Sequence, residues 1–511
     1  MLNNINLTGN HHLKANQLLK RNLIANYVGQ GWASLSTFVF VPVYIHHLGL
    51  EAYGLIGFFA MLHAWFTLLD AGMGPALGRE MARFTGGRNS TESIRDLLFS
   101  VETIALITAI GLITGLWLAS GWMAEAWFVT QDLSTETVKT AIGLMGFVAA
   151  LRVLEGIYRS ALLGLQKQVT YNYILIVNST IKSVGAVGVI VLVESSIEAF
   201  FLWQALASIF AVSVLAMTCR KVLPQPARKA RFSVNELRKV WIYARGMLAI
   251  TFLSLILMQI DKLVLSSTLP LADFGVYSLA STVAMAVLVL VTPINQVWFP
   301  RLSQLHATND APGMKEVFHI GAQLLSVILG SAVIVLFLFS ERVLELWTQD
   351  SLIAKQAAPL LAILIVGNLL NGLMWMPYQA QLAHGWTSLS VRINLVTVIV
   401  LVPATFWVAQ KYGPLEVCFL WLGVNATGLI VGGKLTFDKI LKGEYWRWLR
   451  EDMGRPLVAA LITASFLKAI APYSNNIWLE LAYIACTSLI TLAVATVATP
   501  HLRKQLSKRI F

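Results

Sequence analysis

The sequence predicts an all-α integral membrane protein with about 14 transmembrane helices. Hydrophobic residues make up 57% of the 511 residues and charged residues only 13%, whereas a soluble domain carries about 25% charged residues. The mean hydropathy is +0.69. Apolar runs of about 20 residues recur along the chain, and each is long enough to cross the hydrocarbon as a helix. Lys and Arg gather in alternate gaps between these runs, as expected for a chain that crosses a membrane repeatedly.

Fourteen apolar runs meet the length requirement for a membrane span. They cover residues 23–46, 53–76, 97–119, 138–162, 171–193, 197–219, 240–268, 274–299, 318–340, 353–377, 388–409, 415–435, 456–471 and 477–499.

The charge alternation predicts the orientation of these spans. One set of gaps holds thirty Lys and Arg against ten Asp and Glu; the opposite set holds five against twelve, and the spans hold three against four. Because Lys and Arg are retained in cytoplasmic loops during insertion, both termini are predicted to be cytoplasmic. The net charge of +12 therefore reflects topology, and its dispersal argues against a nucleic-acid partner.

The polar gap at 220–239 divides the chain into two halves. Residues 48–55 resemble residues 269–276, and 161–164 resemble 380–383, with shifts of 221 and 219 residues. Because six spans per repeat is an even number, both halves enter the membrane in the same orientation, and two parallel repeats around a central cavity are typical of transporters. The predicted organisation is an N-lobe (1–219), a basic cytoplasmic linker (220–239), a C-lobe (240–435), a cytoplasmic interfacial helix on anionic lipid headgroups (436–455) and two further spans with a basic tail (456–511).

Charges inside the spans are the main candidates for function, because each costs at least ~2.5–3.5 kcal/mol there. Arg152, Glu155 and Arg159 share one helical face, with offsets of three and seven residues. Lys182 lies near the middle of the next span. Arginine binds phosphate through two parallel hydrogen bonds. These cations therefore predict a binding site for an anionic substrate such as a phosphate or diphosphate.

Further ionisable residues extend this candidate set. Candidate substrate-binding cations are also found at Arg245, Lys262, Arg301 and Arg392, and candidate coupling or charge-pair acids at Glu155, Asp70 and Asp261. An alternative reading assigns Asp261 to a structural ion pair and makes Arg245, Arg301 and Arg392 interfacial anchors of the topology. The three cysteines have no paired spacing, and no catalytic residue or metal site is expected.

Three short motifs resemble those of the bacterial polysaccharide flippases. They are Met258-Gln259-Ile260-Asp261-Lys262-Leu263-Val264-Leu265 followed by Phe274-Gly275-Val276-Tyr277-Ser278-Leu279-Ala280, Leu68-Leu69-Asp70-Ala71-Gly72 with Arg79, and Phe299-Pro300-Arg301-Leu302. The resemblance, together with fourteen spans, covers the whole chain. This family belongs to the superfamily that also holds multidrug and toxic-compound extruders and lipid II flippases.

The resemblance implies a flippase and not an enzyme. Such proteins move an undecaprenyl-diphosphate-linked oligosaccharide from the inner to the outer leaflet of the cytoplasmic membrane, for O-antigen, capsule or exopolysaccharide assembly. It implies alternating access, no cofactor, coupling to a proton or sodium gradient, and a polymerase and a chain-length regulator as partners.

Two alternatives stay open at this point: a multidrug or metabolite exporter of the same superfamily, and a membrane enzyme of polysaccharide assembly. The positive balance of the mid-span charges argues against export of cationic drugs. The first outer loop (46–51) has one acid and no second acid to act with it, and no nucleotide-binding glycine loop is found.

Overall fold

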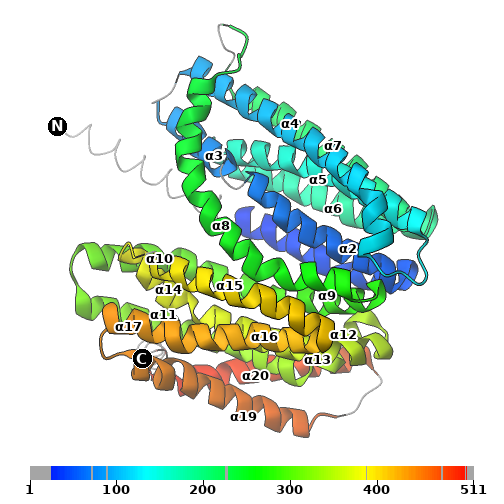
Figure 1. Cartoon of the computed structure of the whole chain (residues 1–511). Helices are drawn as coiled ribbons and strands as arrows, with labels where there is room; N and C mark the ends of the chain where they lie inside the picture. The colour runs from blue at the N-terminus through cyan, green and yellow to red at the C-terminus, as the bar shows by residue number, and fades with distance from the viewer. Residues whose placement is uncertain are drawn as a thin grey trace, which may run out of the picture. The chain divides into compact units, whose positions relative to one another are not determined.

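The computed structural model describes residues 25–70, 73–87, 90–224, 228–386, 388–472, 476–500 and 502. Within its helices, the side chains of 69–70, 239–250, 292–293 and 295–297 lie outside the description. Every regular element in the described ranges is a helix (Figure 1). The predicted all-α membrane fold is confirmed.

The helices form two compact units. The first comprises residues 1–255 with 270–272, and the second 256–269 with 273–511. The long helix α8 (Val234–Thr268) contributes to both. Each unit is described by itself below.

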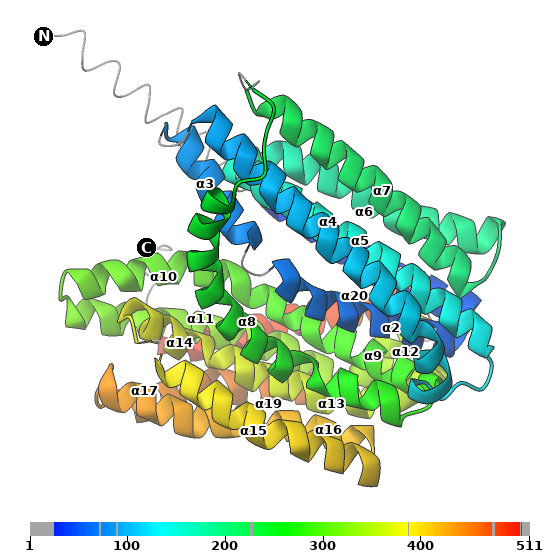
Figure 2. The same ribbon diagram turned by 45° about the horizontal axis from the view of Figure 1, so that its top comes forward.

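In the first unit the helix α5 is central. It packs against α2, α3, α4, α6 and α7, and Figures 1 and 2 show α4, α6 and α7 running alongside it. Its close fit to α3 depends on Gly164, where a Cβ atom would lie only 2.2 Å from the backbone oxygen of Gly78. The helices of this unit are residues 25–39, α2 (Val41–Asp70), α3 (Met73–Thr85), α4 (Thr91–Trp122) with the π-helix η1 (Met123–Trp127), α5 (Thr135–Gly164), α6 (Gln168–Leu192) and α7 (Ile197–Val222).

The predicted turn between the first two spans lies inside α2. Gly49 has a φ of 84°, in the left-handed region that favours glycine, so two helical segments meet there at a kink. The neighbouring Glu51 is buried, and its carboxylate accepts the backbone N–H groups of Gln131, Asp132 and Leu133 at 2.6, 3.0 and 2.8 Å. This acid of the predicted outer loop therefore holds the connection between η1 and α5.

The described part of the predicted linker is attached to the start of α4. Asp96 binds the guanidinium of Arg228 through both carboxylate oxygens and accepts the backbone N–H of Arg231 at 2.8 Å. The Ser100 hydroxyl accepts the N–H of Ser233 at 2.8 Å. These contacts extend to Ser233, so residues 228–233 stay bound to α4 up to the start of α8.

In the second unit the helix α11 is central, and it packs against α10, α13, α19 and α20. The helices of this unit are α9 (Leu271–Ala286), the 3₁₀-helix η2 (Val287–Val291), α10 (Thr292–Ala307), α11 (Ala311–Leu338), α12 (Ser340–Thr348), α13 (Ser351–Leu373), α14 (Trp375–Ala383), α15 (Ser388–Lys411), α16 (Pro414–Thr427), the π-helix η3 (Gly428–Gly432), α17 (Gly433–Lys439), α18 (Tyr445–Arg447), the π-helix η4 (Trp448–Gly454), α19 (Arg455–Ala469) and α20 (Ile477–Ala498).

The helix bounds repeat along the chain with a shift close to 220 residues. Helix α4 begins at 91 and α11 at 311, and α6 spans 168–192 whereas α15 spans 388–411. The sequence similarity between the halves gave the same shift. In the described ranges, α19 and α20 follow the last of the helices related by this shift.

Twelve helices in the described ranges are long and apolar enough to cross a membrane. Two of the fourteen predicted spans are not among them. The first, 23–46, begins outside the described residues and runs through the helix 25–39 into α2. The thirteenth, 456–471, corresponds to α19, which has 15 residues and continues directly from η4.

The stretch 436–455, predicted as one interfacial helix, is divided in the structure. Helix α17 ends at Lys439, Gly443 takes a φ of 84°, and α18 and η4 follow. The glycine turn allows Trp448 and Asp452 to be buried while Trp446 stays exposed.

Candidate functional site

Two of the predicted residues, Glu155 and Lys182, meet on neighbouring helices of the first unit, and Asn178 joins them. Glu155 of α5 lies between Lys182 and Asn178, both of α6. The Lys182 ammonium donates to Glu155 Oε2 at 3.3 Å, and the Asn178 amide donates to Oε1 at 3.5 Å. Lys182 is 8% exposed and Asn178 is 4% exposed. We call Arg152, Glu155, Asn178 and Lys182 the α5–α6 site.

Helix α7 fixes the backbone that carries Lys182. The Trp203 indole N–H donates to the carbonyl of Ile181 at 2.9 Å, and the Gln204 amide donates to the carbonyl of Lys182 at 3.2 Å. The Trp203 ring fills the space at Gly185, where a Cβ atom would lie 2.2 Å from it. The position of the ammonium group is therefore set by packing on three helices.

Arg152 is the second cation of the site, one turn before Glu155 on α5. Its guanidinium carbon lies 5.9 Å from the centre of the Phe59 ring of α2, a separation at which a cation is attracted to the ring face. Its Nε atom is buried and has no hydrogen-bond partner among the described residues. Leaving a buried donor without an acceptor costs about 1–3 kcal/mol, more if it is charged, so this donor is available to an anionic ligand.

The site carries a positive balance. Arg152 and Lys182 outweigh Glu155 by one charge, and Arg159, two turns further along α5, is exposed and interacts electrostatically with Tyr171 of α6. His63 of α2 lies within the field of all three cations. A phosphate can bind both groups at once. The guanidinium offers it two parallel hydrogen bonds, and the ammonium attracts it as a point charge.

Three of the other predicted cations, Lys262, Arg301 and Arg392, belong to the second unit. Lys262 binds Asp261 Oδ2 at 3.3 Å. Arg301 of α10 is exposed and donates to the Gln304 side chain at 2.7 Å, and Arg392 of α15 is exposed. Arg245 of α8 and Asp70 at the end of α2 have side chains outside the described part of the structure.

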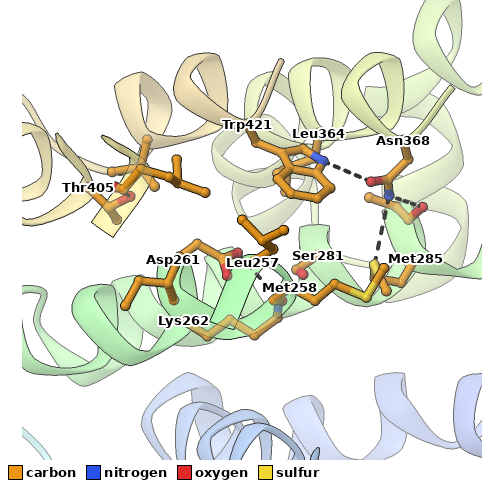
Figure 3. A pocket seen from close by; sticks show the side chains of 14 residues that line it. Leu257, Met258, Asp261, Lys262, Ser281, Met285, Leu364, Asn368, Thr405 and Trp421 are labelled. Atoms are coloured by element: carbon orange, nitrogen blue, oxygen red, sulfur yellow. Dashed lines mark hydrogen bonds and ion pairs between the residues drawn. The ribbon is translucent and has the colours of Figure 1, made fainter. Parts of the chain in front are cut away.

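A small cavity of about 30 Å³ in the second unit is lined in part by Asp261 (Figure 3). The Tyr277 hydroxyl donates to Asp261 Oδ2, whereas Oδ1 is buried and has no hydrogen-bond partner in the described ranges. On the other side of the cavity, Asn368 accepts the indole N–H of Trp421 at 2.9 Å, and Thr405 contributes to the lining. The cavity has room for a water molecule.

Sequence reasoning missed several of these partners. Phe59, Trp203 and Gln204 stand in apolar stretches of the sequence, and no spacing rule connects them to Arg152 or Lys182. Tyr277 belongs to one of the flippase-like motifs, but the sequence assigned it no function. The signal that could have identified Tyr277 is a polar hydroxyl in an apolar run that follows a span with an aspartate inside it.

The fold and the sequence together identify the class of the protein. It has the multi-pass helical fold of transporters in the MOP superfamily, as the solved structures below show. The family described as "Polysaccharide biosynthesis protein" matches residues 19–306, which is more than half of the chain, and the family described as MatE matches residues 247–407. The chain belongs to the polysaccharide biosynthesis protein family, and the resemblance inferred from its motifs is confirmed.

Individual known proteins are similar to this chain over most of its length. A curated protein of Shigella flexneri named "Putative O-antigen transporter" is 19% identical over 401 residues, which is 78% of this chain and 93% of that protein. A solved structure of a multidrug resistance MATE family transporter of the MOP superfamily has a TM-score of 0.70 at 15% identity, covering 83% of this chain and 98% of the other. One of the lipid II flippase MurJ has a TM-score of 0.71 at 13% identity, covering 93% and 98%.

Proposed function

We propose that this protein is a flippase that moves an undecaprenyl-diphosphate-linked oligosaccharide from the inner to the outer leaflet of the bacterial cytoplasmic membrane. Its product enters the assembly of a surface polysaccharide such as O-antigen, capsule or exopolysaccharide. The observation that carries the proposal is the buried Arg152 Nε donor beside Lys182 on α5 and α6. Both termini lie in the cytoplasm, as the distribution of Lys and Arg indicates.

The diphosphate is the part of the substrate that the α5–α6 site accommodates. Its negative charge matches Arg152 and Lys182, and Glu155 keeps the two cations apart and partly neutralised while no substrate is bound. Binding a diphosphate replaces the contact between Lys182 and Glu155 with a contact to phosphate oxygens. Alternating access, in which the site opens first to the inner and then to the outer leaflet, would carry the headgroup across while the lipid tail stays in the bilayer.

Family membership and the named relatives support a transporter in polysaccharide biosynthesis. Asp261 is the strongest candidate for coupling to a proton or sodium gradient, because one of its oxygens is buried beside a cavity and has no hydrogen-bond partner among the described residues. Glu155 is a weaker candidate, since both of its carboxylate oxygens accept hydrogen bonds, Oε2 from Lys182 and Oε1 from Asn178. A polymerase and a chain-length regulator of the same assembly route are the expected protein partners, and no step requires a cofactor or a catalytic residue of this chain.

A multidrug exporter is the competing function, since it shares the fold. A site for cationic drugs needs an acidic lining, whereas the α5–α6 site has one carboxylate against two cations. The electrostatics therefore favour an anionic substrate.

Depletion of the protein in its host tests the proposal. We expect complete lipid-linked repeat units to accumulate on the inner face of the membrane, where a reagent confined to the outer face cannot reach them. The measurement is the fraction of undecaprenyl-diphosphate oligosaccharide that the reagent modifies. Truncated units would instead indicate an enzyme that builds the glycan, and unchanged lipid-linked glycan would indicate export of another compound; either result would reject the proposal.

A further inference from the structure

A second cavity lies in the second unit, between α12, the end of α19 and the start of α20. Its volume is about 490 Å³, which is within the range of about 300–1,000 Å³ that is typical of small-molecule sites. None of its described lining residues belongs to the α5–α6 site. We call it the α12–α20 cavity, and its lining includes Phe339, Arg342, Leu479, Glu480, Tyr483 and Cys486.

One end of the α12–α20 cavity carries a pair of opposite charges. Arg342 of α12 donates through Nη1 to Oε1 of Glu480 of α20. The side chains of Arg342 and Glu480 are 33% and 11% exposed. The pair is therefore partly covered by protein but still accessible to a ligand in the cavity.

The ends of the neighbouring spans set the depth of this pair in the membrane. The span in α11 ends at Leu338 and the span in α20 begins at Ile477, so Arg342 lies just beyond one span and Glu480 lies in the first turn of the other. Trp478 is largely exposed, and tryptophan is enriched where a membrane protein passes through the interface with water. The charged end of the cavity therefore lies at the level of the lipid headgroups.

From this level towards the middle of the membrane the cavity becomes apolar. Leu479 and Cys486 share one face of α20, and both are exposed. A helix rises about 1.5 Å per residue, so the stretch from Glu480 to Cys486 covers about 9 Å. The Tyr483 hydroxyl donates to the carbonyl of Leu467 of α19 at 2.5 Å, so its hydrogen is directed at the protein. The described walls beyond the ion pair are therefore mainly hydrocarbon.

A charged pair at the headgroup level above an apolar wall matches the two ends of a phospholipid. The guanidinium of Arg342 can bind a phosphate through two parallel hydrogen bonds, and the carboxylate of Glu480 can accept hydrogen bonds from a primary ammonium. Because the pair has no net charge, it complements a headgroup that carries one charge of each sign. A lipid diphosphate fits less well, since its negative charges would meet Glu480 beside a single arginine.

We propose that the α12–α20 cavity binds a zwitterionic membrane phospholipid of the phosphatidylethanolamine type. Its phosphate binds Arg342, its ammonium binds Glu480, and one acyl chain lies along the face of α20 that carries Leu479 and Cys486. The lipid replaces the direct contact between the two charged side chains with one contact to each of its own charged groups. Neither contact involves the transported glycolipid, so the lipid site can be tested separately from the transport function.

Protection of Cys486 from alkylation tests the proposal on the full-length protein, delipidated in detergent. Cys486 lines the cavity and is exposed, whereas Cys219 and Cys418 are buried, so N-ethylmaleimide reports on this cavity. The labelling rate at Cys486 is measured by peptide mass spectrometry during titration with phosphatidylethanolamine, phosphatidylcholine or phosphatidylglycerol of identical acyl chains.

We expect phosphatidylethanolamine to protect Cys486 with a midpoint at least about tenfold lower than that of the other two lipids, as the loss of one hydrogen bond between charged groups requires. Phosphatidylcholine keeps the phosphate but has no N–H donor, and phosphatidylglycerol has no ammonium. Equal midpoints for the three lipids would show a cavity that takes any acyl chain without selecting a headgroup, and would overturn the proposal. Protection by undecaprenyl diphosphate at a lower concentration, or no protection by any lipid, would overturn it as well.

Two variants assign the two ends of the headgroup. Glu480→Gln removes the acceptor for the ammonium and the negative charge that balances Arg342, so we expect phosphatidylglycerol to protect at a lower concentration than phosphatidylethanolamine. Arg342→Gln should raise the midpoints of all three lipids at least about tenfold. The control Glu345→Gln changes an exposed acid of α12 outside the described lining, and it should keep the wild-type order of the lipids.

The wild-type order of the lipids in Glu480→Gln would contradict the assignment of the ammonium to this residue. If a variant fails to fold, the comparison of the three lipids on the wild-type protein still decides whether the cavity selects the zwitterionic headgroup.

Discussion

Arg152→Ala is expected to lower the transport rate at least about 100-fold while the protein remains in the membrane at its normal level. A guanidinium contributes two parallel hydrogen bonds to a phosphate, each worth about 1.5–3 kcal/mol because the groups are charged. Loss of about 3 kcal/mol in binding the moving headgroup corresponds to a factor of about 100. The measurement is the initial rate at which lipid-linked glycan becomes accessible on the outer face, normalised to the amount of protein.

Variants of the same helix provide the controls for Arg152. Arg152→Lys keeps the charge but not the fork of donors, so an intermediate rate is expected. Lys139→Ala removes an exposed cation of α5 that pairs with Glu136 one turn away, and it should leave the rate unchanged. If Arg152→Ala and Lys139→Ala transport equally well, the α5–α6 site does not bind the substrate.

Glu155→Ala is expected to destabilise the protein by about 3–5 kcal/mol, the cost of removing one partner of a buried ion pair. The substitution leaves Lys182, which is 8% exposed, without its anion, and Arg152 lies on the same face with no compensating charge. The measurement is the free energy of unfolding in detergent, compared with the wild type.

The control for Glu155 is Glu136→Ala on the same helix. Glu136 belongs to an exposed pair, and such pairs contribute about 0–1 kcal/mol. The double substitution Glu155→Leu with Lys182→Met should recover most of the stability, because apolar residues can replace a buried pair, but it should not restore transport. A loss of stability in Glu155→Ala no larger than in Glu136→Ala would show that the pair is not buried in the membrane.

The sequence contains enough information to predict the α5–α6 site in part. The helical period places Arg152, Glu155 and Arg159 on one face, and the distance of Lys182 from both ends of its span prevents it from reaching an interface. Such residues must face protein, so the contact between Lys182 and Glu155 follows from general rules. The fit of Trp203 into Gly185 depends on how α6 and α7 cross, and helical periodicity does not specify a crossing.

Other contacts could not be derived from periodicity. Lys262 pairs with Asp261, although adjacent residues on a helix do not face one another, and the geometry depends on Tyr277 from the next helix. His319 and Asp452 are separated by 133 residues, and the π-helical path of η4, which places Asp452 against α11, has no simple sequence signature. The turn at Gly443 could not be predicted from the sequence either. A glycine in a basic, aromatic stretch is also compatible with a continuous interfacial helix.

Transport by the purified protein in liposomes tests the central claim most directly. Lipid-linked glycan isolated from depleted host cells is incorporated with the protein, and its accessibility to an impermeant reagent is followed over time under imposed proton or sodium gradients. We expect the wild-type protein to move the glycolipid between leaflets and Arg152→Ala to move it at a rate close to that of protein-free liposomes. A wild-type rate equal to that of protein-free liposomes under every gradient would contradict the claim that this chain is a lipid-linked oligosaccharide flippase.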